Sequence, residues 1–77
     1  MVKVYSTPTC PYCNTLKAFL KQNNIVFEDI DVLEDIKARD EIIEKTGQLG
    51  VPVIDIDGEL VVGFDKERIS QLLNISK

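Results

Sequence analysis

Cys10 and Cys13 are the residues of this chain whose type and spacing could carry covalent chemistry. They are its two cysteines, and Pro11 and Tyr12 lie between them. A structural disulfide is a poor interpretation, because so short a loop restricts the unfolded chain very little. The chain has no histidine, which excludes a cysteine–histidine protease. The pair therefore indicates either redox chemistry or metal binding.

The residues on both sides of the pair place it at the start of a helix. Residues 2–5 suit a short strand, and residues 6–9 suit a turn. Residues 11–23 then show the apolar spacing of a helix, at Cys13, Leu16, Phe19 and Leu20. Pro11 suits the first helical position. Because unpaired backbone N–H groups and the helix dipole meet at such a helix start, the thiolate form of Cys10 is favoured there.

Length and composition predict one small domain, residues 1–77, with a single core. The net charge is −4 and the lysines and arginines are scattered, so we expect neither nucleic acid nor a membrane surface as a partner. Residues 1–8 are too short for a signal peptide and the chain has no apolar run that could span a membrane. We expect a cytoplasmic monomer.

The rest of the chain predicts an α/β fold in the order β-α-β-α-β-β-α, with a four-stranded mixed sheet and three helices. The elements expected after the first helix are a strand at 25–30 parallel to the first, a helix at 31–46 capped by Asp31 and ended by Gly47, a loop at 48–50, an antiparallel hairpin of strands 51–56 and 59–62, and a last helix capped by Asp65. Asp57-Gly58 supplies the hairpin turn. The sides expected to be buried are Ile36, Ile42 and Ile43 in the middle helix and Ile69, Leu72 and Leu73 in the last.

Three segments in this order resemble a glutaredoxin. They are the Cys-Pro-Tyr-Cys run after the first strand, Val51-Pro52 at the start of the hairpin, and Gly63-Phe64-Asp65 before the last helix. The resemblance spans nearly the whole chain and implies the thioredoxin fold in its minimal glutaredoxin form. It also implies a dithiol oxidoreductase that reduces protein or glutathione mixed disulfides, with glutathione as co-substrate and no bound cofactor.

The resemblance assigns roles to particular residues. Cys10 would be the nucleophile and Cys13 the resolving thiol, while Pro52 would be a cis proline facing them. The backbone of Val51 would pair with an extended thiol substrate, as in β-augmentation on a small scale. The substrate-binding residues it implies are Thr9, Pro11, Tyr12, Val51, Pro52, Gly63, Phe64 and Asp65. Disulfide-bearing clients compatible with such a surface include ribonucleotide reductase, a methionine sulfoxide reductase and a peroxidase.

Three positions depart from the glutathione-using members of that family. Thr7 stands where a basic residue precedes the first cysteine, Val62 where a glycine is expected, and Lys66 where a second acid follows Asp65. These departures are shared with the glutaredoxin-like hydrogen donors of ribonucleotide reductase, which a thioredoxin reductase reduces. The Pro-Tyr pair and Asp65 resemble the glutathione-using members instead.

Other interpretations of the same residues stay open at this point. A zinc or iron–sulfur centre needs about four ligands, so with two cysteines it would require a dimer or added glutathione. Tyr12 is equally well explained as a surface aromatic, and Phe64 as an apolar plug at the base of the last helix. Asp65 is first a helix cap. Lys17 is interpreted as a solvated lysine, although it could also soften the electrostatic field around the thiolates.

Overall fold

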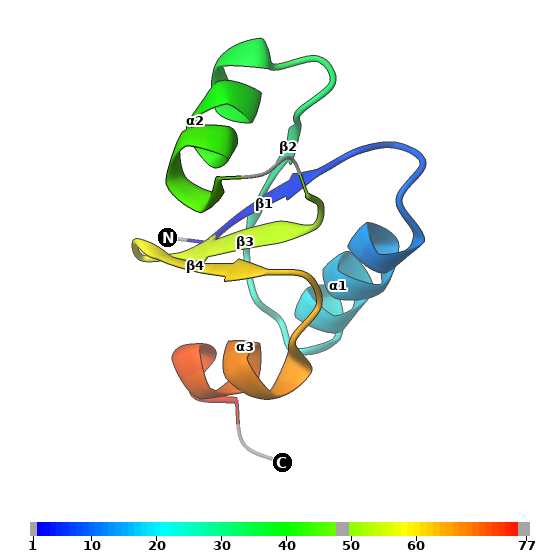
Figure 1. Cartoon of the computed structure of the whole chain (residues 1–77). Helices are drawn as coiled ribbons and strands as arrows, with labels where there is room; N and C mark the ends of the chain where they lie inside the picture. Colours follow the sequence, from blue (N-terminus) through cyan, green and yellow to red (C-terminus); the bar gives the residue numbers. More distant parts are fainter. Residues whose placement is uncertain (1, 48–49, 76–77) are drawn as a thin grey trace.

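A four-stranded sheet with helices on both faces forms the molecule (Figure 1). The computed structural model describes residues 2–47 and 50–75. Within these ranges the elements are β1 (Val2–Ser6), α1 (Pro11–Gln22), β2 (Glu28–Asp31), α2 (Ile36–Thr46), β3 (Val53–Ile56), β4 (Glu59–Val62) and α3 (Lys66–Leu73). The α/β class, the order of the elements and the mixed sheet are as predicted.

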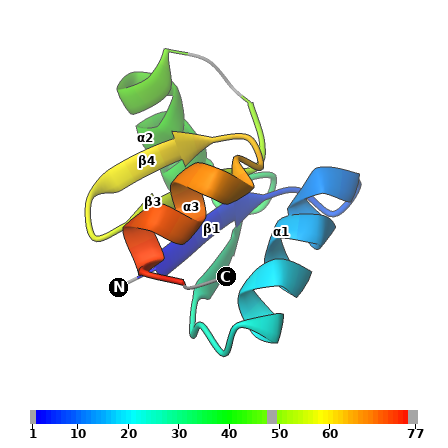
Figure 2. The ribbon, with the colours of Figure 1, turned by 90° about the horizontal axis from the view of Figure 1, so that it is seen from below.

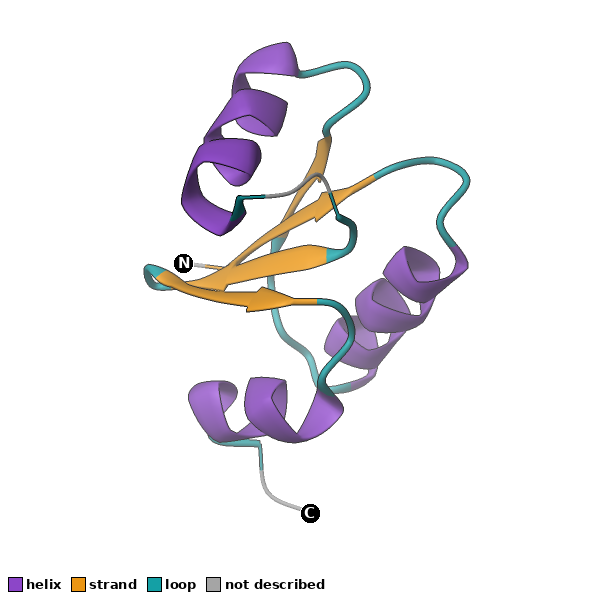
Figure 3. Cartoon of the chain, viewed as in Figure 1, coloured by secondary structure: helices purple, strands orange, loops and turns teal. Residues whose placement is uncertain are grey.

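The strands lie in the order β2-β1-β3-β4 (Figure 3). β1 pairs with β2 in parallel, and β3 pairs with both β1 and β4 in antiparallel fashion. The β1–α1–β2 unit is therefore the parallel crossover expected from the first 30 residues. β1 lies inside the sheet, so its carboxyl end delivers the cysteine segment from a strand that is held on both sides.

Apolar residues alternate along the strands and fill a core on each face of the sheet. Val2 and Val4 of β1 pack with α1 and α3, in a cluster that includes Leu16, Leu20, Ile54 and Ile69. Tyr5 and Val53 face the other side, where Val32, Ala38 and Ile42 cover them. Figure 2 shows α1 and α3 next to each other, away from α2. The four apolar residues that predicted the first helix, Cys13, Leu16, Phe19 and Leu20, are all buried.

The hairpin turn forms where the Asp-Gly pair predicted it. Asp57 and Gly58 both have positive φ, 51° and 98°, as the favoured two-residue hairpin turn requires. The Gly58 N–H also donates to the Asp55 carboxylate at 2.8 Å. β3 starts two residues later than predicted, because residues 51 and 52 form a separate segment before it. Most of the predicted loop at 48–50 lies outside the described residues.

The second strand and the second helix start later than predicted. β2 begins at Glu28, so residues 25–27 connect α1 to the sheet and do not extend the strand. Asp31 ends β2, and its carboxylate accepts the Leu33 N–H at 2.9 Å in a turn. The helix cap is Asp35, which accepts the Ala38 N–H at 3.0 Å. Glu34, three residues after Asp31, gave Asp31 the sequence pattern of a cap, but the Asp31 side chain is engaged in the turn after β2 and the helix starts four residues later.

The buried side of α2 also differs from the predicted one. Ile36 and Ile43 are 58% and 38% exposed, while Ala38 and Ile42 are buried. The helix begins at Ile36, so Ala38 and Ile42, four residues apart, form the stripe that faces the sheet. On α3 the prediction is confirmed, since Ile69 is fully buried and Leu72 and Leu73 pack against the same core.

Replacing the cap of α2 tests this correction. Asp35→Ala is expected to lower the free energy of unfolding by about 1 kcal/mol, because the Ala38 N–H loses its partner. Asp40→Ala is the matched control on the same helix, since Asp40 makes only an exposed ion pair with Arg39. Urea denaturation of both variants measures the difference. Equal losses would contradict the assignment of Asp35 as the cap.

The described helices are too short to cross a bilayer. α1, with 12 residues, spans about 18 Å, whereas a membrane helix needs about 20 apolar residues. No helix among residues 2–47 and 50–75 is long and apolar enough to cross a membrane.

Candidate active site

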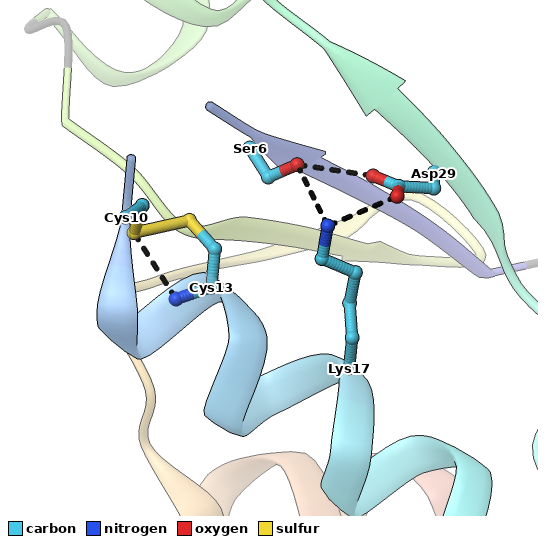
Figure 4. A network of polar contacts seen from close by, with 5 residues as sticks. All are labelled: Ser6, Cys10, Cys13, Lys17 and Asp29. Atoms are coloured by element: carbon cyan, nitrogen blue, oxygen red, sulfur yellow. Dashed lines mark hydrogen bonds and ion pairs between the residues drawn. A yellow bond between two sulfur atoms is a disulfide. The ribbon is translucent and has the colours of Figure 1, made fainter. Parts of the chain in front are cut away.

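Cys10 is the cap of α1, directly before its first turn. Its backbone is extended, with φ −97° and ψ 109°, and Pro11 is the first helical residue. The Cys13 N–H donates to the Cys10 sulfur at 3.0 Å (Figure 4). The Asn14 N–H donates to the Cys10 carbonyl at 3.3 Å. A sulfur at this position accepts a backbone N–H at the positive end of the helix dipole. Such contacts favour thiolate over thiol when the sulfur is reduced.

The two cysteines are joined in a disulfide across the first turn of α1. Their Cα atoms are 5.2 Å apart, within the usual range for a bridged pair. Their exposure differs in a way that matters for chemistry, because Cys10 is 9% exposed while Cys13 is fully buried at 0%. A reagent in solution can therefore approach the Cys10 sulfur more readily than the Cys13 sulfur.

The register of the sheet brings three separate segments to the end where the dithiol lies. Tyr5 of β1 pairs with Val53 of β3, and Val53 pairs with Val62 of β4. The chain leaves β1 after this row, enters β3 just before it and leaves β4 just after it. Residues 7–10, 51–52 and 63–65 therefore lie at one end of the sheet, as Figures 1 and 2 both show.

The segment before β3 has the backbone that the family resemblance implied. The Val51–Pro52 peptide bond is cis. Pro52 is buried and Val51 is half-buried. The Gly63 N–H donates to the Pro52 carbonyl at 2.7 Å, and Gly63 itself has a positive φ of 83°. This hydrogen bond ties the proline segment to the start of the segment that leads into α3.

The start of α3 is held by a cap and by an aromatic contact. The Asp65 carboxylate accepts the Arg68 N–H at 3.1 Å, as expected of a cap. The Phe64 ring meets the Phe19 ring of α1 edge to face, with centroids 5.7 Å apart. The ammonium of Lys66 lies 5.7 Å from the same Phe19 ring. α3 is thus anchored to the helix that carries the cysteines.

Two exposed side chains next to these segments are large and hydrophobic. Tyr12, between the cysteines, is 69% exposed, and Val62, at the end of β4, is 45% exposed. Thr9 is also exposed, and Thr7 is half-buried, with its carbonyl accepting the Cys10 N–H at 3.4 Å. The sequence-predicted site residues therefore lie on these three segments and on the first turn of α1. Phe64 makes the contacts of a partly buried packing residue, and Asp65 makes those of a helix cap.

Comparison with known proteins identifies the family of this chain. The family model for glutaredoxin matches residues 2–61. The chain belongs to the glutaredoxin family. An uncharacterized glutaredoxin-like 8.6 kDa protein in the rubredoxin operon of Clostridium pasteurianum is 51% identical to it over 73 residues, which cover 95% of this chain and 97% of that protein.

Two further comparisons agree with that family and with the fold. Glutaredoxin 3 of Escherichia coli strain K12 is 34% identical over 64 residues, covering 83% of this chain and 77% of that one. The crystal structure of a mutant thioredoxin-like protein superposes with a TM-score of 0.91 at 43% identity, covering 97% of this chain and 96% of that one. The fold is thus thioredoxin-like, and the disulfide of this glutaredoxin-family chain indicates thiol–disulfide exchange.

A polar cluster beside the dithiol was missed by the sequence interpretation. Lys17, interpreted as solvated, has a side chain only 20% exposed and pairs with Asp29 of β2 at 2.9 Å. Its ammonium also donates to the hydroxyl of buried Ser6 at 3.4 Å, and that hydroxyl donates to Asp29 at 3.0 Å (Figure 4). Lys17, Ser6 and Asp29 lie on three different elements, so their contacts follow from the packing of α1 against the sheet and no sequence spacing indicated them.

The phenol of Tyr5 has a raised pKa. Burial raises the pKa of its phenol above the ordinary value of 10.0, and the carboxylate of Asp55 adds to the effect. Tyr5 packs in the core on the α2 face of the sheet. It therefore stays neutral near pH 7 and does not serve this glutaredoxin as a base.

The described ranges contain no group of three or more histidine, cysteine, aspartate or glutamate residues arranged to hold a metal ion. A metal or iron–sulfur centre on this glutaredoxin would have to take its further ligands from a second molecule or from glutathione, as the sequence indicated.

Proposed function

We propose that this chain is a dithiol oxidoreductase that reduces protein and glutathione mixed disulfides and is itself reduced by glutathione. Cys10 is the nucleophile and Cys13 the resolving thiol. The observation that supports this division is the difference in burial, because the helix-capping Cys10 keeps 9% of its surface exposed and Cys13 keeps none. Reaction with a bulky disulfide is therefore expected to begin at Cys10.

The proposed reaction balances in two steps. The Cys10 thiolate attacks one sulfur of the client disulfide, forming a mixed disulfide and releasing the other sulfur as a thiolate that takes up a proton. The Cys13 thiol then loses a proton and attacks the Cys10 sulfur, which releases the second client thiol and closes the disulfide seen in the structure. The client gains two electrons and two protons, and the dithiol loses them.

Glutathione restores the dithiol in this proposal. One glutathione thiolate opens the Cys10–Cys13 disulfide and forms a mixed disulfide on Cys10, and a second removes it as glutathione disulfide. Membership of the glutaredoxin family supports this donor. The glutathione peptide would lie along Val51 and residues 9–12, with its end near residues 63–65. No bound cofactor takes part.

The clients of this reaction would be proteins that carry disulfides, such as ribonucleotide reductase, a methionine sulfoxide reductase or a peroxidase. The proposed enzyme acts as a monomer in the cytoplasm.

A second candidate differs only in the electron donor. Val62, which replaces an expected glycine, is 45% exposed at the end of β4, and Thr7 places no positive charge before Cys10. A branched side chain and a missing cation both weaken a site for a small anionic peptide. These two residues favour a thioredoxin reductase as donor to the same dithiol.

Parallel coupled assays separate the two donors. We expect NADPH oxidation with glutathione, glutathione reductase and a mixed disulfide substrate to exceed that with a thioredoxin reductase. Val62→Gly is expected to lower the KM for the glutathione mixed disulfide, because the glycine removes an exposed branched side chain at the end of β4, next to residues 63–65. Leu33→Gly is a control for loss of an exposed apolar side chain in another part of the surface, where Leu33 is 63% exposed. Turnover only with the thioredoxin reductase would contradict the glutathione proposal.

A further inference from the structure

Lys17, Asp29 and Ser6 form a closed cluster of hydrogen bonds where α1 meets β1 and β2. The ammonium of Lys17 contacts both the carboxylate of Asp29 and the hydroxyl of Ser6, and the hydroxyl contacts the carboxylate. Ser6 is 3% exposed and is the last residue of β1, directly before the cysteine segment. The cluster therefore holds a positive charge from α1 and a negative charge from β2 in contact with each other.

The positive member of the cluster comes from the helix that carries the resolving cysteine. Lys17 follows Cys13 by four residues on α1, a spacing that puts Cβ atoms about 5–6 Å apart on one side of a helix. In Figure 4 the side chains of both residues point from α1 toward the sheet. Asp29 reaches the ammonium from the far side, on β2. The ammonium thus belongs to the helix that carries the dithiol, and the carboxylate belongs to the neighbouring strand.

We propose that Lys17 and Asp29 are positioning residues that set the reduction potential of the Cys10–Cys13 pair through opposed charges. Lys17 stabilises the thiolate of the reduced pair, and Asp29 limits that stabilisation by neutralising part of the field. This inference rests on the proposed dithiol chemistry and not on the identity of the electron donor. The charges of Lys17 and Asp29 would then influence the reduction potential of the dithiol in addition to the effect of the helix N-terminus.

The sign of each contribution follows from the chemistry of reduction. Dithiothreitol reduces the disulfide by giving up two electrons and two protons, becomes its cyclic disulfide, and leaves two cysteine thiols. One of these then ionises, so whatever stabilises the thiolate draws the equilibrium toward the reduced protein and raises the potential. Loss of the Lys17 charge should therefore make the pair more reducing. Loss of the Asp29 charge should make it more oxidising.

Redox equilibration of the full chain with dithiothreitol tests this assignment. Lys17→Met keeps the apolar stem, and Asp29→Asn keeps the shape of the side chain. Each is expected to change the equilibrium constant about two- to fivefold, in opposite directions, equivalent to about 10 to 20 mV at about 30 mV per tenfold. The double variant should return toward the original value. Added salt should shrink both shifts, because both side chains are partly exposed.

Lys21→Met is the matched control. It removes the same charge from the same helix, one turn farther from Cys13, and is expected to shift the equilibrium less than Lys17→Met. Shifts of Lys17→Met and Asp29→Asn in the same direction would overturn the proposal, because both would then report only a loosened contact between α1 and β2. No shift in either variant would overturn it too. The equilibrium constant is obtained without glutathione. This test can therefore contradict the roles of Lys17 and Asp29 while glutathione remains the electron donor, and it can support those roles if glutathione is not the donor.

Discussion

A Cys10→Ser variant is expected to lose disulfide reduction down to the uncatalysed background, while Cys13→Ser keeps part of its activity toward glutathione mixed disulfides. Cys10 is the less buried cysteine and caps the start of α1, and serine is a far weaker nucleophile than a thiolate there. Without Cys13, a second glutathione can still resolve the mixed disulfide on Cys10. The measurement is NADPH oxidation coupled through glutathione reductase, with a mixed disulfide of glutathione and 2-mercaptoethanol as substrate.

The two variants should differ less in their activity toward protein disulfides. Release of a protein client depends on attack by Cys13 from within the molecule, so both variants are expected to lose reduction of a protein disulfide such as that of insulin. Mass spectrometry of Cys13→Ser should then show the client or glutathione held on Cys10. Equal loss of both variants toward the glutathione mixed disulfide would contradict the assignment of roles. Matching thermal unfolding of both variants in their reduced forms would show that neither loss comes from unfolding.

Most of the fold could be predicted because its signals are local. The apolar spacing from Cys13 to Leu20 defines α1, and Asp57-Gly58 defines the hairpin through the φ values that its turn requires. Asp65 caps α3 as predicted. Each of these signals lies within a few residues of the structure it specifies.

The differences arise where two local signals compete. Asp31 and Asp35 both suit a helix start, and the choice depends on how the chain turns after β2 pairs with β1. The burial of Ala38 in place of Ile36 follows from that choice. The pairing of Lys17 with Asp29 likewise depends on the packing of α1 against β2, which no spacing within either element specifies.

The candidate site could be predicted in its residues and only partly in its geometry. The cysteine pair was evident from two positions, while its relation to residues 51–52 and 63–65 depends on the row that joins Tyr5, Val53 and Val62 across the sheet. From the sequence, only the family resemblance implied that these segments lie next to the cysteine pair. The network around Lys17 belongs to this chain's own packing, and neither the motif nor the resemblance indicated it.

The stability of α3 matters for the site, because the residues just before α3 pack against the helix that carries the cysteines. Ile69→Ala is expected to lower the free energy of unfolding by about 2–5 kcal/mol, because Ile69 is fully buried between α3 and the sheet and a cavity would remain. For a domain of this size the melting temperature should fall by about 8 to 40 °C. Ile69→Val, which removes one methylene, should cost about 0.5–1.5 kcal/mol and keep the chain folded.

Ile36→Ala is the matched control, the same substitution on another helix at a residue 58% exposed, and it should change stability by less than about 0.5 kcal/mol. The Phe64–Phe19 contact lies just before α3. The milder Ile69→Val should therefore raise the KM for the glutathione mixed disulfide while the rate at which Cys10 is alkylated stays the same. Equal stability of Ile69→Ala and Ile36→Ala would contradict the buried position of Ile69. An unchanged KM in a measurably destabilised Ile69→Val would show that α3 does not contribute to substrate binding. Binding would then depend on residues 9–12 and on Val51-Pro52.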